Sequence, residues 1–298
     1  MRAHSDSTHH TDLPSVSTDT RRLQYMPGSV GMERDLARAP LFAASATSPD
    51  ELPGPVETGS LYGYAFTATA AGGWPTVRDL LVLTELIDRY VKAGCPDSRL
   101  VPMGARDLCR AAGFPSAGGR QFQQACACLM RLRSLTVRYV APVAPDRVVA
   151  HVWGPVEEGF IASGPDGRGS VRISLHLAAL VRMGRLVYLD REMLRELYRK
   201  DHYAARLWTF LESETLGHPF RYRLFPAPVG EPAEATMVPA IADLLSLSGW
   251  ARRGRVKERI EQAARVVAEV DPRYRLSVER ASKRTMWNLH VTKNEHPP

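Results

Sequence analysis

The stretch Arg252–Val270, RRGRVKERIEQAARVVAEV, and the runs after it, YRLSVER (274–280), ASKR (281–284) and MWNLHVT (286–292), decide the fold of this chain. In the first stretch apolar residues recur every three or four positions, which predicts one amphipathic helix with an inward-facing stripe. That stripe consists of Val256, Ile260, Ala263, Val267 and Val270. The two later β-rich runs flank a polar turn, so they predict a β-hairpin.

The same region carries most of the net charge. The chain has 298 residues, a formal net charge of +7 and a pI near 9.4. Residues 1–60 contain five Lys and Arg against eight Asp and Glu, whereas residues 251–285 contain eleven against five. Such a basic block indicates a polyanionic partner, because Lys and Arg neutralise phosphates and release condensed counterions. A solvated basic surface without a partner is the alternative.

Composition excludes several classes of protein. Hydrophobic residues make up 44% of the chain and charged residues 24%, as in ordinary globular proteins. No apolar run approaches the roughly 18–20 residues that a membrane-spanning helix needs, so we expect no membrane partner. The first 30 residues lack the apolar core of a signal peptide, and four cysteines in a chain of this length do not make a disulfide framework. We therefore expect a cytoplasmic protein.

Residues 1–60 are rich in Ser, Thr, Pro, Asp and His and show little periodicity. This composition predicts a mostly disordered N-terminal tail. Within it, Met32–Phe42 has the pattern of a short amphipathic segment, either a docking segment or one without a role.

The region 61–158 predicts an N-terminal domain of three helices followed by a hairpin. Thr76 and Asp79 have the spacing of a capping box, at the start of a helix that Gly94 ends. Two further helices are expected at 104–112 and 120–132. The β-rich runs at 136–140 and 148–153, separated by a Pro-Asp turn, predict the hairpin.

The region 159–298 predicts a second domain with the same order of elements. It begins with β-rich runs at 160–162 and 170–174, and helices follow, with Asp190 and Asp201 as N-caps. A strand is expected at 220–225 and a short helix at 237–247, before the basic helix and the hairpin. Three helices followed by a hairpin define the winged-helix variant of helix-turn-helix. The expected fold class is α+β, with two tandem winged-helix domains and a disordered N-terminal tail.

The basic helix and its hairpin are the strongest candidate site, because a helix N-terminus and arginines both favour phosphate. Arg grips guanine bidentately, and Gln pairs with adenine. The predicted DNA contacts of the helix are Arg252, Arg253, Arg255, Lys257, Arg259, Gln262 and Arg265. The hairpin adds Arg280, Lys283 and Arg284. The alternative is a solvated amphipathic helix with an exposed turn.

The helix at 120–132 is a weaker candidate because the charge around it is modest. Its predicted contacts are Arg120, Gln123, Gln124 and Arg131. A contact between helices or between two subunits explains these residues as well as DNA does.

An enzymatic site is not expected. A nicking enzyme would need a Tyr nucleophile and a metal held by paired histidines. Tyr198 and Tyr203 are available, but the histidines are isolated in the sequence. Cys126 and Cys128 are two residues apart, so on a helix they point in different directions and do not chelate one ion. The turn Gly164–Gly169 lacks the pattern of a nucleotide-binding loop. We therefore predict no catalytic residue, no metal and no cofactor.

The chain resembles plasmid replication initiators built from tandem winged-helix domains. Four stretches carry this resemblance: LVPMGARDL (100–108) with GGRQF (118–122), VYLDREMLREL (187–197), YAARLWTFL (203–211) and the basic region 252–291. It covers residues 74–293 and is one of pattern more than of invariant motif. The 60-residue polar N-terminus departs from the pattern.

The resemblance implies a protein that binds direct repeats (iterons) in double-stranded origin DNA, promotes opening of an AT-rich segment and recruits the host's replicative helicase, with the host initiator as a further partner. It also implies homodimers in some states, and main contacts from the C-terminal winged helix. A winged-helix transcriptional regulator is the main alternative, because it needs the same DNA contacts, and a DNA-nicking enzyme is a second one.

Overall fold

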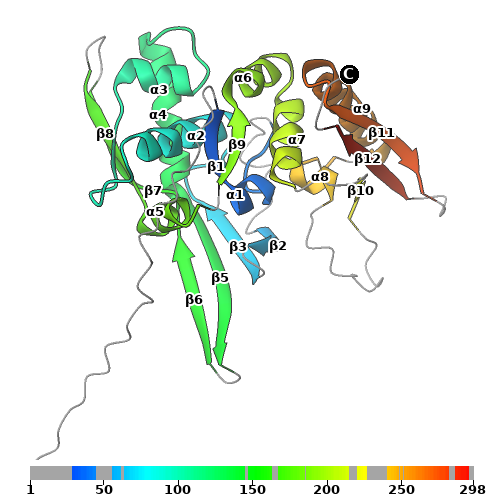
Figure 1. Ribbon diagram of the computed structural model, residues 1–298, viewed down its shortest axis with the longest axis horizontal. Helices are drawn as coiled ribbons and strands as arrows, with labels where there is room; N and C mark the ends of the chain where they lie inside the picture. The colour runs from blue at the N-terminus through cyan, green and yellow to red at the C-terminus, as the bar shows by residue number, and fades with distance from the viewer. Residues whose placement is uncertain are drawn as a thin grey trace, which may run out of the picture.

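The computed structural model describes residues 29–44, 56–61, 64–144, 147–162, 167–184, 186–214, 220–226, 240–247, 249–250, 252–281 and 286–294. Across these ranges no helix has the length and apolar character needed to cross a bilayer. Figure 1 shows two helical groups, one around α2, α3 and α4 and the other around α7 and α9, with β1, β9 and α6 between them.

The first group is a winged helix. Its elements are α2 (Val77–Lys92), β4 (Leu100–Pro102), α3 (Ala105–Ala111), α4 (Gly119–Ser134), β7 (Val156–Ile161) and β8 (Gly169–Ile173). The strands form an antiparallel sheet in the order β4-β8-β7. Asp79 accepts a hydrogen bond from the backbone N–H of Thr76, which confirms the predicted helix start.

The second group repeats this topology. Its elements are α7 (His202–Ser213), β10 (Phe220–Arg223), α8 (Ile241–Leu244), α9 (Arg253–Val270), β11 (Tyr274–Arg280) and β12 (Trp287–Lys293). The sheet order β10-β12-β11 matches β4-β8-β7, strand for strand. Val256, Ile260, Ala263 and Val267 are buried, as the periodicity of the basic helix predicted, and Val270, the last residue of the predicted stripe, is half-buried against the core. The prediction of two tandem winged-helix units is confirmed. Of the helix predicted at 237–247, α8 forms residues 241–244, and 237–239 lie outside the described residues.

The wing of the first unit is not the hairpin that the sequence predicted. β5 (Leu135–Ala144) and β6 (Arg147–Trp153) do pair, but in a separate sheet with β2 (Val56–Leu61) and β3 (Tyr64–Ala70), in the order β2-β3-β5-β6. The wing hairpin is β7–β8, because β4 pairs with β8. The boundary expected between residues 158 and 159 therefore falls inside β7. Figure 1 shows β5 and β6 projecting away from the helices.

Part of the expected N-terminal tail is an ordered segment of the core. β1 (Ser29–Glu33) pairs antiparallel with β9 (Leu186–Asp190), and α1 (Arg34–Arg38) follows it. Met32, Leu36, Leu41 and Phe42 are fully buried. Residues 29–44 are therefore ordered within the predicted tail, and they include the segment Met32–Phe42 that the sequence pattern had set apart. Residues 56–61 form β2, and the rest of the predicted tail lies outside the described residues.

Two more helices complete the middle of the molecule. These are α5 (Leu175–Arg182) and α6 (Arg191–Lys200). Asp190 caps α6 by accepting a hydrogen bond from the N–H of Met193, at 2.8 Å. Asp201 accepts from the N–H of Tyr203, also at 2.8 Å, and so caps α7. Both N-caps are confirmed. Because Asp201 ends α6 and starts α7, the two helices meet at one residue.

Candidate nucleic-acid interface

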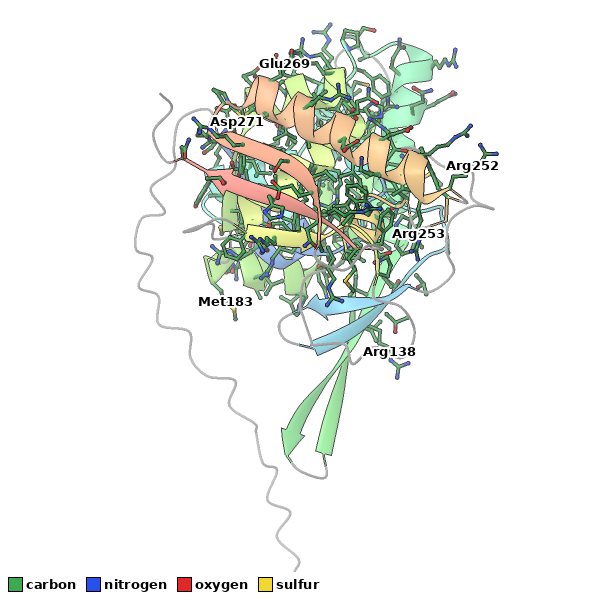
Figure 2. The ribbon with its side chains drawn as sticks, turned by 90° about the vertical axis from the view of Figure 1, so that its right-hand side faces the viewer. Arg138, Met183, Arg252, Arg253, Glu269 and Asp271 are labelled. Atoms are coloured by element: carbon green, nitrogen blue, oxygen red, sulfur yellow. The ribbon has the colours of Figure 1, made fainter. Side chains whose placement is uncertain are left out.

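The helix α9 has a basic end and an acidic end. Figure 2 shows α9 lying across one face, with Arg252 and Arg253 at its N-terminal end and Glu269 and Asp271 at the other. Arg252, Arg253 and Arg255 are all exposed. A helix N-terminus carries free N–H groups and the positive end of the helix dipole. The three arginines therefore add to a field that already attracts phosphate.

Aromatic rings lie beside this basic end. The Arg253 guanidinium carbon lies 5.4 Å from the centroid of the Phe225 ring. Trp250, three residues before the start of α9, keeps 40% of its surface exposed. The contact with Phe225 uses a ring face and leaves the N–H groups of Arg253 free to bind oxygen acceptors.

Trp287 joins α9 to the wing. Lys257 Nζ lies 4.6 Å from the Trp287 ring centroid, and the guanidinium carbon of Arg280 lies 5.5 Å from it. Lys257 also pairs with Glu261 at 2.7 Å, so part of its charge is neutralised within the helix. Arg280, at the end of β11, is exposed. The other predicted wing contacts, Lys283 and Arg284, lie outside the described residues.

Arg259 has a different position from the other predicted contacts of α9. Both of its terminal nitrogens donate to the carboxylate of Asp201, one of them at 2.8 Å. The Asp201 side chain is 3% exposed, and the guanidinium carbon lies 4.0 Å from the Tyr203 ring centroid. This pairing occupies the group that the sequence assigned to DNA. Arg259 therefore fixes α9 against the start of α7.

We expect Arg259→Ala to destabilise the protein by about 1.5–3 kcal/mol, because it removes a charged hydrogen-bonding partner from a buried carboxylate. The matched control is Arg265→Ala, on the exposed side of the same helix, with an expected change within about 0.5 kcal/mol. Urea unfolding followed by circular dichroism measures both. Equal midpoints for the two variants would contradict the positioning role of Arg259.

The exposed face of α9 also contains Gln262 and Arg265. Both point away from the buried stripe and lie beyond the basic end along the helix. A side chain must be exposed to contact a DNA groove, and both of these are. Gln262 and Arg265 therefore stay predicted DNA contacts.

In the first unit, α4 presents Arg120, Gln123 and Gln124 at its exposed surface. Arg131 does not join them, because its guanidinium binds Asp79 at 2.8 and 3.0 Å. Asp79 is fully buried at the start of α2. Arg131 therefore ties α4 to α2, as Arg259 ties α9 to α7.

Two arginines near the first wing were missed by sequence reasoning. Arg168, just before β8, and Arg133, near the end of α4, are exposed. Arg168 belongs to the loop 164–169, for which the sequence predicts only a turn, because the sequence places the wing in the preceding hairpin, β5–β6. The short β-type run that forms β4 was the signal that could have located this wing. A winged helix needs a strand between its first two helices, and that strand pairs with the wing.

Among the cysteines of the first unit, Cys109 and Cys128 are buried and Cys126 is half-buried. Burial raises the pKa of Cys109, Cys126 and Cys128, so these groups are protonated at neutral pH. Across the described ranges there is no group of three or more His, Cys, Asp and Glu side chains placed to hold a metal ion.

The fold and the basic end of α9 together define a tandem winged-helix protein. Crystal structures of domains 2 and 3 of RctB, a replication initiator, have the same fold. A selenomethionine derivative matches with a TM-score of 0.54 and 14% identity over 87% of this chain and 100% of that chain. A second RctB structure matches with a TM-score of 0.52 and 13% identity, over 88% of this chain and 96% of that chain. No family model and no curated protein matches the chain.

The similarity to RctB confirms, for the fold, the expected resemblance to replication initiators with tandem winged helices. At this identity it concerns the architecture and not individual residues.

Proposed function

We propose that this protein is a cytoplasmic, non-enzymatic replication initiator that binds repeated sites in double-stranded DNA. The observation that carries the proposal is the exposed cluster Arg252, Arg253 and Arg255, at the N-terminus of the helix that a winged helix places in the major groove. The tandem arrangement shared with RctB supports initiation over a single-site regulator.

In this proposal α9 makes the main contacts and α4 adds weaker ones. Arg280 and the wing tip bind phosphates or the neighbouring minor groove. Binding of successive direct repeats supplies the energy that opens an adjacent AT-rich segment, and the bound array then recruits the replicative helicase with the host initiator. Homodimers acting as repressors belong to the same proposal.

The positions of the two tyrosines support a binding function without catalysis. The hydroxyl of Tyr198 accepts a hydrogen bond from Arg78 Nε at 2.9 Å, and Tyr198 is buried. Burial raises its pKa, which opposes the formation of a phenolate nucleophile. Tyr203 is covered on one face by the guanidinium of Arg259.

Footprinting on the DNA that flanks the coding sequence tests the proposal. We expect several regularly spaced direct repeats to be protected, next to an AT-rich tract. Protection of one short palindrome over a promoter would instead support a transcriptional regulator. Cleavage of the DNA in the presence of Mg²⁺, with a covalent tyrosyl adduct, would contradict the non-enzymatic part.

A further inference from the structure

The helix α6 lies between the two winged helices (Figure 1). Its ten residues, Arg191–Lys200, span about 15 Å at the usual rise of an α-helix. Ion pairs join it to α2 of the first unit and to α9 of the second.

On the side of the first unit, the contacts involve charged groups with little access to water. Arg191 binds Asp88 of α2 at 2.5 Å and lies 3.6 Å from Glu85. The Asp88 side chain is 1% exposed. Near the other end of α6, Arg78 of α2 donates to the hydroxyl of Tyr198. These contacts, about two turns apart along α6, hold it against α2 at two points.

On the side of the second unit, the last turn of α6 contacts α9. Lys200 pairs with Glu269 at 2.7 Å. The next residue, Asp201, binds Arg259 through both carboxylate oxygens. Because Lys200 and Asp201 are adjacent in the chain, movement of α9 relative to α6 would break both contacts together.

The two DNA-contacting helices are therefore linked through a short helix fixed at both sides. We propose that α6 is a spacer that sets the separation and the rotational phase of the two DNA contacts made by α4 and α9. Arg78 and Arg191 are its positioning residues toward the first unit. The inference rests on the proposed function, because it assumes that both winged helices bind DNA.

A rigid spacer has a measurable consequence for DNA binding. Each base pair advances the DNA by about 3.4 Å, and about five turn it by half a helical turn. Two linked contacts gain about 10²–10⁴ in affinity when both are made, and lose it when the geometry forbids one of them. A rigid protein should therefore reject DNA whose two contact segments are moved apart.

The test uses duplexes selected by the full-length protein from a random-sequence library, then resynthesised with five base pairs inserted between the two protected segments. We expect the insertion to weaken binding by the wild type by about 100-fold or more. In the double variant that combines Arg78→Ala with Arg191→Ala, the same insertion should weaken binding by less than about tenfold. The control is Arg195→Ala, whose pair with Glu192 lies within α6, and it should keep the wild-type ratio. If the double variant also shows the wild-type ratio of the dissociation constants with and without the insertion, the proposal that α6 is a spacer is overturned.

A second measurement does not depend on DNA. Spin labels on p-acetylphenylalanine at Gln124 and Glu258, both exposed, leave the native thiols in place. Electron–electron distance measurements should give one narrow distribution in the wild type and a broader one in the double variant. Equal widths would overturn the spacer. If the wild type selects no duplex, the proposed function fails, and the distance distributions still decide whether α6 holds the two units.

Discussion

Arg206→Met is expected to destabilise the protein by at least about 3 kcal/mol, a large share of the roughly 5–15 kcal/mol that holds a typical protein folded. Arg206 is fully buried in α7, and its guanidinium donates to three backbone carbonyls. The acceptors are the oxygens of Ala37 at 2.8 Å, Ala39 at 2.6 Å and Phe42 at 3.3 Å. Methionine fills much of the same space but leaves these carbonyls without this donor.

The charge of Arg206 strengthens these hydrogen bonds. Burial lowers the pKa of its guanidinium to about 9, which is still above neutral pH, so the side chain is positively charged in the folded protein at pH 7. Hydrogen bonds that involve a charged group contribute about twice as much as neutral ones. Arg206→Lys keeps one charged donor but not the planar fork, so it should recover only part of the loss.

Urea unfolding at pH 7, followed by circular dichroism, measures the effect. The matched control is Arg221→Met, the same replacement at an exposed position on β10, with an expected change within about 0.5 kcal/mol. If Arg206→Met and Arg221→Met unfold at the same urea concentration, Arg206 does not hold the segment 37–42 in place.

The same segment illustrates what the sequence could not predict. Residues 29–44 resemble a tail in composition, and their order comes from distant partners. β1 pairs with β9, about 150 residues further along, and Arg206 is more than 160 residues from the carbonyls it binds. The apolar pattern of Met32–Phe42 was a real signal, but nothing local indicates which surface buries it.

Local signals predicted the helices well. The stripe of α9 and the caps Thr76, Asp190 and Asp201 depend on residues within four positions of each other, so periodicity and capping chemistry were sufficient. The prediction of the first wing was wrong because its strand pairing depends on residues far apart in the sequence. β4 is three residues long, and its partner β8 lies about 70 residues later. Two hairpins followed α4, and local patterns could not indicate which one pairs with β4.

Two of the predicted DNA contacts show the same limit of local patterns. Arg131 and Arg259 have the residue type and the helix expected of DNA contacts, but each binds a buried aspartate more than 50 residues away. A sequence pattern shows that an arginine is present on a helix. It does not show whether a carboxylate from another helix has already bound it.

The triple variant Arg252→Ala, Arg253→Ala, Arg255→Ala is expected to weaken DNA binding by about 100-fold or more. A lost base contact costs about 1–3 kcal/mol, the lost phosphate contacts add to this, and 1.4 kcal/mol is a factor of ten in affinity. All three side chains are exposed, so the fold should be retained. Fluorescence anisotropy with a selected duplex measures the dissociation constant over a range of salt concentrations.

The control removes three exposed arginines away from the basic end of α9: Arg182, Arg199 and Arg221. Both triple variants lose the same net charge, so the general attraction of the protein for DNA falls equally in each. We expect the control to bind within about threefold of the wild type. Equal losses in the two triple variants would contradict the assignment of α9 as the main DNA-contacting helix.

The salt dependence separates phosphate contacts from base contacts at the basic end of α9. Three lost phosphate contacts should reduce the slope of log affinity against log salt by about 2.7, because each neutralised phosphate contributes about 0.9. A lost base contact lowers affinity for the selected sequence without an equal change in this slope. Arg252 is the N-cap of α9 and Arg253 its first residue, so we expect both to lie close to the DNA backbone, and Arg255, two residues further along the first turn, to lie deeper in the groove. We therefore expect Arg252→Ala and Arg253→Ala to change mainly the slope, and Arg255→Ala to reduce discrimination between the selected duplex and a scrambled one.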